Sequence, residues 1–560
     1  MNGDGSYGGT INLIRKRPTR NFQASFGANV GSWETYRVDA DVSEPLNADG
    51  TLRGRVVAAW KDGNAFRDYK SSKNYTVYGT IDFEPTPNTL VNFGLSYKHQ
   101  EQRGNVSSNP ITYYSSSGQF VGLLPRSFSN AAPWAGYEHD QLTISGAIEQ
   151  KIGNNWTAKL QFGHEEIERP LVLLSTLNPW VLTQPASSTA YKDVRQYNEH
   201  VTLDVTGSLS LFGRTHEILF GAGASRSKTS LLRGNGASTS YADMGTTYAD
   251  GGGLIPYPTD LESRAYAYEF FSTKRRHVYA AGRFHLADPL RVIAGIRISD
   301  YDRLDAAPTT WWNYDMKERG VITPYAGITL DLMRNISLYG SYASIFQPQS
   351  NRDVNGRPID PEEGQTYEAG IKGELFDGRL NASANYFWMR TDNTAEAVGQ
   401  YVTGTTNETA YRAVMGVKRH GYEVELSGEL LPGWQAQGSF VLNSSSLRSA
   451  NNSPRHQFKL NSSYRFDHNS VFNGLNLGIG ARWKSHIGTG VTSYGGSLEQ
   501  GAFWLFDTMA RYEIGDKLTV GANVDNLFDK KYFSGLTNWS AILYTWGEPR
   551  SFRLNASVRF

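Results

Sequence analysis

The chain has 560 residues, a formal net charge of +1, 57 glycines and no cysteine. Its basic residues are scattered and balanced by acidic ones, which gives no indication of nucleic-acid binding. The absence of cysteine excludes disulfides, thiolate metal sites and a cysteine nucleophile.

The length exceeds that of one soluble hydrophobic core, so the chain should form either several domains or one large barrel. No break in composition divides it, which favours the barrel. No apolar run approaches the roughly 18 residues that a membrane helix requires. The mean hydropathy of −0.47 is nevertheless compatible with a membrane β-barrel, in which only every second strand residue faces lipid.

Segments in which apolar and polar residues alternate recur along the whole chain. Clear examples are residues 91–98, 292–299, 380–388 and 518–525. The last ten residues alternate without exception, and their apolar set ends on Phe560. Because successive strand side chains point to opposite faces, such a terminal strand is typical of a barrel with lipid outside and water inside.

Two kinds of connection separate these strands: short ones rich in Pro, Gly, Asn and Asp, which form turns, and mostly longer, variable ones. The predicted short turns are Pro45–Gly50, Glu84–Asn88, Gly153–Asn155, Phe212–Arg214, Ala287–Leu290, Leu332–Asn335, Phe376–Arg379, Leu431–Gly433, Asp467–Asn473 and Ile514–Asp516. If both chain ends lie on their side, ten short turns imply eleven long loops and twenty-two strands.

The sequence therefore predicts an all-β fold: a 22-stranded antiparallel transmembrane β-barrel with short periplasmic turns and long extracellular loops. The alternative is a run of soluble β-domains such as propellers. Propeller blades repeat about every 40–50 residues, and the sequence shows no such repeat.

Three motifs resemble a known family. They are YGGTINLIRKRPT at 7–19, the segment 345–374 with IFQPQ and IDPEEGQTYEAGIKGE, and VDNLFDKKY at 524–532, followed by GEPR at 547–550 and the terminal Phe560. In their order and spacing they resemble the TonB-dependent outer-membrane receptors, most closely the ferric-siderophore branch. The resemblance implies a 22-stranded barrel that binds a ferric chelate outside and admits it past a plug, with energy supplied through TonB.

The resemblance also implies a domain division. Residues 1–20 match the C-terminal remnant of the plug domain and its linker, and residues 21–560 match the transmembrane barrel. Most of the plug and the TonB-contacting segment have no counterpart in the 560 residues. We therefore expect this chain alone not to couple to TonB. A passive outer-membrane channel, a non-transporting surface-binding protein and a partial sequence stay open as alternatives.

Aromatic residues in the predicted loops are the candidate ligand contacts, because flat siderophore groups suit aromatic walls. An interfacial belt that anchors the barrel is the alternative for each of them. Adjacent Trp311 and Trp312 cannot both face lipid on a regular strand. The candidates are Tyr113, Tyr114, Trp134, Tyr137, Trp180, Tyr191, Trp311, Trp312, Tyr314 and Tyr544.

The resemblance implies a ferric siderophore as the transported ligand and no intrinsic cofactor, since siderophore iron is already fully ligated. Loop arginines such as Arg103, Arg126 and Arg352 could contact an anionic chelate, or pair with lipopolysaccharide or loop carboxylates. Arg553 and Arg559 should line the lumen. No catalytic motif is present, so we expect no enzyme. The expected partners are outer-membrane lipid and lipopolysaccharide. Hydroxamate, catecholate and mixed siderophores remain open.

Overall fold

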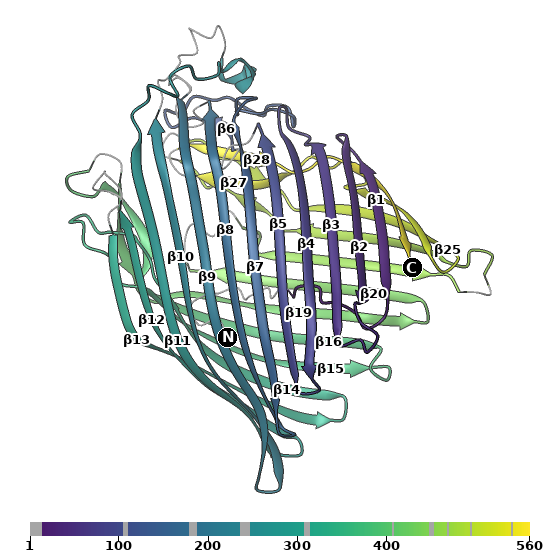
Figure 1. The fold of residues 1–560 in the computed structure, drawn as a ribbon. Coiled ribbons are helices and arrows are strands. Elements are labelled where there is room, and N and C mark those ends of the chain that lie inside the picture. The colour runs from purple at the N-terminus through teal and green to yellow at the C-terminus, as the bar shows by residue number, and fades with distance from the viewer. Residues whose placement is uncertain are drawn as a thin grey trace.

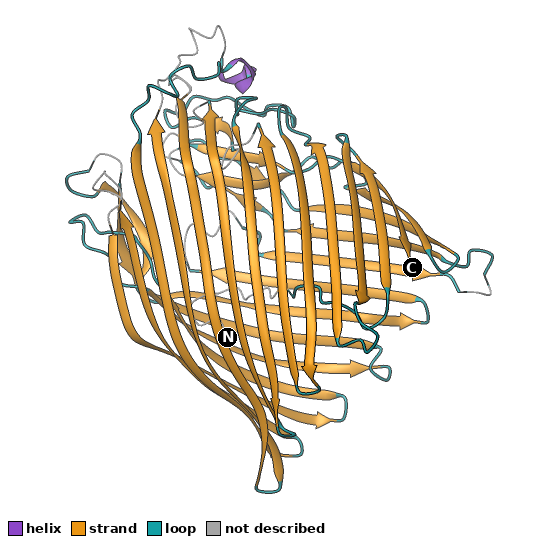
Figure 2. Ribbon diagram, in the orientation of Figure 1, coloured by secondary structure: helices purple, strands orange, loops and turns teal. Residues whose placement is uncertain are grey.

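The computed structural model describes residues 14–104, 110–177, 187–235, 247–306, 314–405, 408–446, 453–467, 470–492, 495–538 and 541–560. Most of these residues belong to one 22-stranded sheet that curves into a barrel (Figure 1). Figure 2 shows that strands dominate the molecule and that loops gather at the ends of the strands. None of the helices among the described residues is long and apolar enough to cross a membrane.

The barrel strands are β1 (Gln23–Gly31), β2 (Thr35–Pro45), β3 (Leu52–Asn64), β4 (Ser71–Thr86), β5 (Thr89–Arg103), β7 (Gly136–Ile152), β8 (Trp156–Thr176), β9 (Ser187–Leu211), β10 (Arg214–Asn235), β11 (Ala267–Ala287), β12 (Leu290–Ala306), β13 (Tyr314–Met333), β14 (Ile336–Gln347), β15 (Glu362–Leu375), β16 (Leu380–Asp392), β19 (Val417–Leu431), β20 (Trp434–Ser445), β21 (His456–Arg465), β22 (Leu475–Lys484), β25 (Phe503–Ile514), β26 (Leu518–Asp525) and β29 (Ser551–Arg559). Each pairs antiparallel with its neighbours along the chain.

The first and last strands close the barrel. β1 pairs antiparallel with β29, with Ser25 opposite Arg559 and Gly31 opposite Arg553. Closure removes the edges at the two ends of the sheet, as spanning a membrane with strands requires. All ten predicted short turns join consecutive barrel strands. The predicted 22-stranded antiparallel barrel is thus confirmed. Its two ends are called here the short-turn end and the long-loop end.

The two faces of the wall differ as the alternation predicts. On β29, Phe552 and Leu554 are 54% and 59% exposed, and apolar residues on the same face of other strands are exposed as well. The opposite face is polar, and there Arg553 forms an ion pair with Asp525. The exposed apolar face is the one that meets hydrocarbon, and the polar face lines the lumen.

The wall is uneven in height. β1, β26 and β29 have 9, 8 and 9 residues, whereas β8, β9 and β10 have 21, 25 and 22. A membrane strand needs only about 9–11 residues. The strands β8–β13 therefore continue well beyond the hydrocarbon layer at the long-loop end and form a tall side (Figure 1).

The segment 14–20 lies against the lumen face of β2, β3 and β4. Lys16 Nζ lies 2.6 Å from a carboxylate oxygen of Asp41, and Arg17 forms a 3.1 Å ion pair with Asp82. The backbone N–H of Thr19 donates to the hydroxyl of Ser43 at 2.8 Å. These residues fall within the predicted plug remnant, and the predicted boundary at residue 20 stays a prediction.

Short elements occupy the loops at the long-loop end. A small sheet joins three of them in the order β27, β28 and β6, so the loop after β5 pairs with the loop before β29. These elements are β6 (Ile111–Tyr114), η1 (Tyr248–Asp250), η2 (Gly252–Leu254), β17 (Thr394–Tyr401), β18 (Thr409–Val414), β23 (Ile487–Gly488), β24 (Glu499–Gln500), β27 (Phe533–Asn538) and β28 (Ile542–Trp546).

Candidate functional site

The loops that follow β5, β8, β10, β22 and β26 share a hydrophobic core, which we call the loop core. Its largest fully buried side chain is that of Tyr544, which is 1% exposed. The Tyr544 hydroxyl accepts a hydrogen bond from the backbone N–H of Leu124 at 2.7 Å, and the Trp546 indole N–H donates to the Leu124 carbonyl at 2.9 Å. The members are Ile111, Phe128, Ala132, Ala135, Leu177, Tyr248, Ile255, Ile487, Leu498, Phe533, Leu536, Ile542, Tyr544 and Trp546.

An ion pair fastens two of these loops together. The guanidinium of Arg126 donates to both carboxylate oxygens of Asp529, at 2.9 and 2.7 Å. A third donor, the backbone N–H of Arg550, reaches the same carboxylate at 2.9 Å. The Arg126 hydrogen bonds, followed by that from Arg550, lower the pKa of Asp529 to about 2. The pair is therefore fully charged at neutral pH and links the loop after β5 to the loop before β29.

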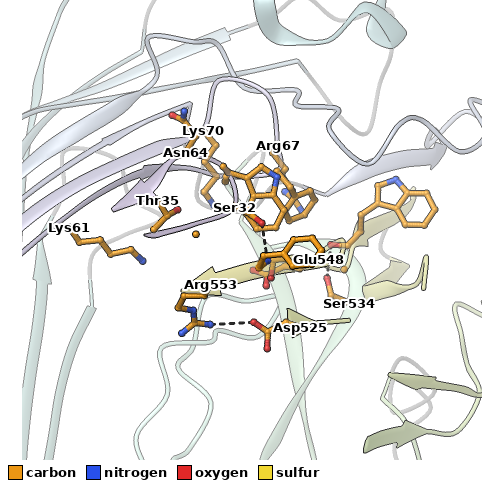
Figure 3. Close-up of a pocket in the computed structure, with 18 of the residues that line it drawn as sticks. Ser32, Thr35, Lys61, Asn64, Arg67, Lys70, Asp525, Ser534, Glu548 and Arg553 are labelled. Carbon is orange, nitrogen blue, oxygen red and sulfur yellow. Dashed lines mark hydrogen bonds and ion pairs between the residues drawn. The ribbon is translucent and has the colours of Figure 1, made fainter. Parts of the chain in front are cut away.

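A pocket of about 1130 Å³ lies beside the loop core, where β1 meets β29. We call it the seam pocket. It is formed by the ends of β1, β2 and β3 with the loop after β3 on one side, and by β26, β29 and the β27–β28 hairpin on the other (Figure 3). The charged and aromatic residues that line it are Trp33, Arg37, Lys61, Phe66, Arg67, Lys70, Asp525, Tyr532, Trp546, Glu548, Phe552 and Arg553.

The seam pocket carries more positive than negative charge. Five basic and two acidic side chains line it, an excess of three positive charges. Arg553 pairs with Asp525 at 3.2 Å and Arg37 with Asp39 at 3.0 Å, whereas among the described residues Lys61 forms no ion pair. Partial burial lowers the pKa of Lys70; the nearby Arg67 adds to this effect and Glu548 opposes it. Cations held in a partly desolvated pocket would gain from an anionic ligand.

The turn between β1 and β2 contributes an aromatic wall to this pocket. Trp33 and Glu34 have φ values of 57° and 55°, in the left-handed region that bulky residues rarely adopt. Asn64 holds the turn: its backbone N–H donates to the Trp33 carbonyl at 3.0 Å, and its side-chain amide donates to Glu34 at 2.8 Å. The Trp33 ring lies 6.0 Å from that of Phe66. Phe376 and Asp377 in a short turn have a similar pair of positive φ values, as tight hairpin turns require.

The structure brings four of the predicted aromatic contacts together. Tyr113, Tyr114 and Trp134 pack against the loop core, and Tyr544 lies inside it. Three others lie on barrel strands: Tyr137 on β7, Tyr191 on β9 and Tyr314 on β13. Trp180, Trp311 and Trp312 lie outside the described residues. None of the seven described candidates lines the seam pocket, and their contact with a ligand stays a prediction.

The three loop arginines bind loop or strand carboxylates. Arg103 pairs with Glu101 at 2.8 Å, Arg126 with Asp529 and Arg352 with Glu408 at 2.8 Å. Of the two expected lumen arginines, Arg553 lines the seam pocket. These pairs stabilise the loops and leave less of the arginines' charge for an anionic chelate.

Sequence reasoning missed most of the seam-pocket residues. They lie near the two ends of the chain, and only the pairing of β1 with β29 brings them together. One feature of the sequence could have indicated them. Trp33 and Lys70 lie in the connections after β1 and β3, which are both on the side predicted to be extracellular. Among the described residues no group of three His, Asp or Glu could hold a metal ion. The groups that line the seam pocket are mainly cationic and aromatic.

The closed barrel with an apolar outer face and a polar lumen defines a β-barrel protein of the outer membrane. Residues 105–527 match the family model described as TonB dependent receptor-like, beta-barrel. The chain belongs to this family, whose short turns are periplasmic and whose long-loop end is extracellular. It is 34% identical to the ferripyoverdine receptor of Pseudomonas aeruginosa, over 100% of this chain and 69% of that protein.

A second curated relative and a solved structure are similar to this chain over nearly its whole length. The ferric-pyoverdine 358 receptor of Pseudomonas putida is 34% identical, over 96% of this chain and 66% of that protein. The solved structure of P. aeruginosa FpvA bound to heterologous pyoverdines matches with a TM-score of 0.89 at 32% identity, covering 100% of this chain and 74% of that one. The chain thus spans about two thirds of the length of these relatives, which are receptors rather than enzymes.

Proposed function

We propose that this barrel captures a ferric siderophore of the pyoverdine class at the extracellular surface. The observation that carries the proposal is the seam pocket, which combines an excess of three positive charges with the aromatic side chains of Trp33, Phe66, Tyr532 and Trp546. Two relatives at 34% identity are receptors for ferric pyoverdines. A ligand with a flat chromophore and anionic groups matches both properties of this pocket.

The expected sequence of events follows from the electrostatics. The cations steer an anionic chelate to the long-loop end, and the aromatic walls then hold its flat face. Passage across the membrane would use TonB, as is typical of the family. The expectation that these 560 residues do not couple to TonB by themselves stays a prediction. Uptake of ferric pyoverdine by iron-starved cells that express only this chain would contradict it.

A binding titration tests the proposal. We expect the purified chain in detergent to bind ferric pyoverdine and to quench its own tryptophan fluorescence on binding. The variant Lys61→Glu/Lys70→Glu should weaken binding about 30-fold, because two charge-assisted contacts together contribute on the order of 2 kcal/mol. Heat-modifiable migration on a gel would show that the variant is folded.

Lys418→Glu/Lys517→Glu is the matched control. These residues make the same change in net charge, but Lys418 lies at the start of β19 and Lys517 in the short turn before β26, and neither lines the seam pocket. We expect this variant to keep the affinity of the wild type. Equal losses in the two double variants would show that net charge, and not the pocket, governs binding.

A further inference from the structure

The upper part of β13 is paired on one side only. β13 is the last strand of the tall side, and it pairs with β12 along most of its length (Figure 1). Its pairing with β14 reaches upward only to Tyr325, which lies opposite Ala343. Above this level β14 pairs with β15 alone. The residues from Tyr314 to Pro324 therefore form a free sheet edge, which we call the β13 edge.

Pro324 explains where the pairing with β14 stops. In an antiparallel strand the N–H and C=O of one residue point to the same neighbour, and successive residues alternate. The Asp331 N–H donates to the Pro289 carbonyl on the β12 side at 2.8 Å, so Pro324, an odd number of positions away, faces β14. Its carbonyl accepts the hydroxyl of Ser344 at 3.0 Å. Because Pro324 has no N–H to donate to β14, the ladder ends there.

Above Pro324 the backbone of the β13 edge has no partner strand on its outer side. Tyr301 of β12 faces β13 by the same alternation, so its partner Glu318 faces β12 and Lys317 faces the free side. Among the described residues the loop after β14 reaches this edge through a side chain, since the Tyr314 hydroxyl donates to the Gln349 carbonyl. A row of unpaired N–H and C=O groups is a template for a further strand.

A pocket of about 330 Å³ lies where the two strands separate. Thr323, Pro324 and Tyr325 of β13 line it on one side, and Ala343 and Ser344 of β14 line it on the other. An added strand would begin at this fork, where the pocket leaves room for a side chain.

Acidic side chains lie beside the β13 edge. The charges that act on Glu318 are those of Asp360, in the loop after β14, and Glu363, at the start of β15. Among the described residues none of these three carboxylates forms an ion pair. The basic side chains of the β13 edge, Lys317 and Arg319, pair with other carboxylates. The three carboxylates therefore favour a partner that carries positive charge.

We propose that the β13 edge binds an extended polypeptide segment rich in basic residues, which adds to the wall as one further strand. Backbone hydrogen bonds to the edge give the affinity, and attraction by Glu318, Asp360 and Glu363 selects basic side chains. A neutral peptide would match the edge without the charge, and a free cation would match the charge without the edge. The site shares no residue with the seam pocket, so its occupancy does not depend on the proposed siderophore.

The first test measures binding of a fluorescein-labelled peptide to the full chain in an uncharged detergent. The peptide has about eight alternating Thr and Lys residues, the length of an ordinary strand. Fluorescence anisotropy gives its affinity. We expect the wild type to bind this peptide, and to bind a peptide of alternating Thr and Glu about tenfold more weakly. Equal binding of the two peptides would contradict selection by the three carboxylates.

Backbone methylation separates strand addition from simple attraction between charges. A peptide N-methylated at every second residue keeps one complete hydrogen-bonding edge and should bind like the parent peptide. A peptide N-methylated at two adjacent central residues loses a donor on each edge, so it should bind about fivefold more weakly. If these two methylated peptides bind equally well, charge alone holds the peptide and the proposal fails.

Lys317→Pro removes one donor of the β13 edge and keeps the ladder with β12, because the Lys317 N–H faces the free side. Lys317→Gln is the matched control, since it loses the same charge and keeps the N–H. The proline variant should bind the Thr–Lys peptide about fivefold more weakly than the glutamine variant. Heat-modifiable migration of both would show that they are folded. Equal affinities of the two variants would place the peptide elsewhere.

Glu318→Gln/Glu363→Gln tests the charge. It should weaken binding of the Thr–Lys peptide about fivefold, because two partly exposed charge pairs are lost. Glu262→Gln/Glu396→Gln is the matched control: it removes two loop carboxylates that already pair with basic side chains, at 3.4 and 2.6 Å. This variant should bind like the wild type, and equal losses in the two double variants would overturn the role of the edge.

A second copy of the chain is the alternative occupant of the β13 edge. Sedimentation velocity should show that the wild type is a monomer in detergent with and without the peptide. A dimer that forms in Lys317→Gln and is lost in Lys317→Pro would assign the edge to a second copy and overturn the proposal.

Discussion

The barrel wall has a short side, around β1, β26 and β29, and a tall side, from β8 to β13, and the two differ in how they are built at the extracellular end. Around β29 and β1 the strands are short, and the loops after β1, β3 and β26 enclose the seam pocket beside the loop core. From β8 to β13 the strands themselves continue outward, and their ladder hydrogen bonds satisfy the backbone, except along the β13 edge. Where the wall is low, the candidate pocket is built from loops and strand ends; where it is tall, the wall is a regular ladder of paired strands.

The largest effect on the short side is expected from a substitution that disrupts the packing of the loop core. Tyr544→Ala removes a side chain that is 1% exposed, which should cost about 3–5 kcal/mol of local stability because it leaves a cavity and an unpartnered Leu124 N–H. Protease cleavage within the loops should increase sharply, and binding of ferric pyoverdine should fall. The barrel should keep its heat-modifiable migration.

Phe528→Ala is the control for that variant. It lies in the same loop but is 71% exposed, so its truncation should leave the loops protected. If Tyr544→Ala also leaves protease sensitivity unchanged, the loops do not depend on a shared core.

Acid should loosen the short side in a defined pH range. The pKa of Asp529 is about 2, below its usual value of 3.8. A lowered folded-state pKa gives stability that is fully present above about pH 4 and is lost as the pH falls toward 2. Because the pair is partly exposed, the effect should be on the order of 1 kcal/mol. Thermal melting of the loop core, followed by near-ultraviolet circular dichroism from pH 5 to 2, measures it.

Asp529→Asn should lower the melting temperature at pH 5 and flatten its dependence between pH 4 and 2. Asp302→Asn, which removes a carboxylate paired with Arg319 on the tall side, should leave that dependence in place. A transition that persists in Asp529→Asn would assign it to another group.

The smallest expected effect concerns the strained turn of the seam pocket. Trp33→Asn places a residue that tolerates positive φ at 57°, so stability should rise by about 0.5–1 kcal/mol. Affinity for ferric pyoverdine should nevertheless fall about fivefold, because an aromatic wall is lost. Chemical unfolding and a binding titration measure the two effects.

Phe212→Asn is the matched control for the turn. Phe212 has a φ of 52° and is 98% exposed in a turn at the short-turn end. Its replacement should relieve the same strain without changing affinity. A loss of affinity in both variants would contradict a specific role for Trp33.

The regular part of the fold could be predicted from sequence because its cause is local. Alternation sets which side chain faces lipid, and turn residues mark each short connection, so the strand number followed from residues such as those of β29. The loop elements could not be predicted in this way. β6 pairs with β28, more than 400 residues away, and no local pattern specifies such a partner.

The residues of the candidate site also depend on contacts between distant parts of the chain, which no local pattern specifies. Tyr544 is predicted as a ligand contact because it is aromatic and lies in a loop; the structure places it in the loop core, and the contact stays a prediction. Trp33 and Lys70 were not predicted, since they become neighbours of Arg553 only when β1 pairs with β29. Composition identified the kind of side chain that gathers in the loops, and closure of the barrel determined which of them line a pocket.

Lysine modification with and without ferric pyoverdine tests the central claim most directly. Acetylation of the folded chain, mapped by mass spectrometry, compares Lys61 and Lys70 in the seam pocket with Lys228 and Lys274 on the outer face of the tall side. We expect the ligand to protect the first two and to leave the second two unchanged. Protection of Lys228 and Lys274, or of none of the four when ligand is bound, would contradict capture at the seam pocket.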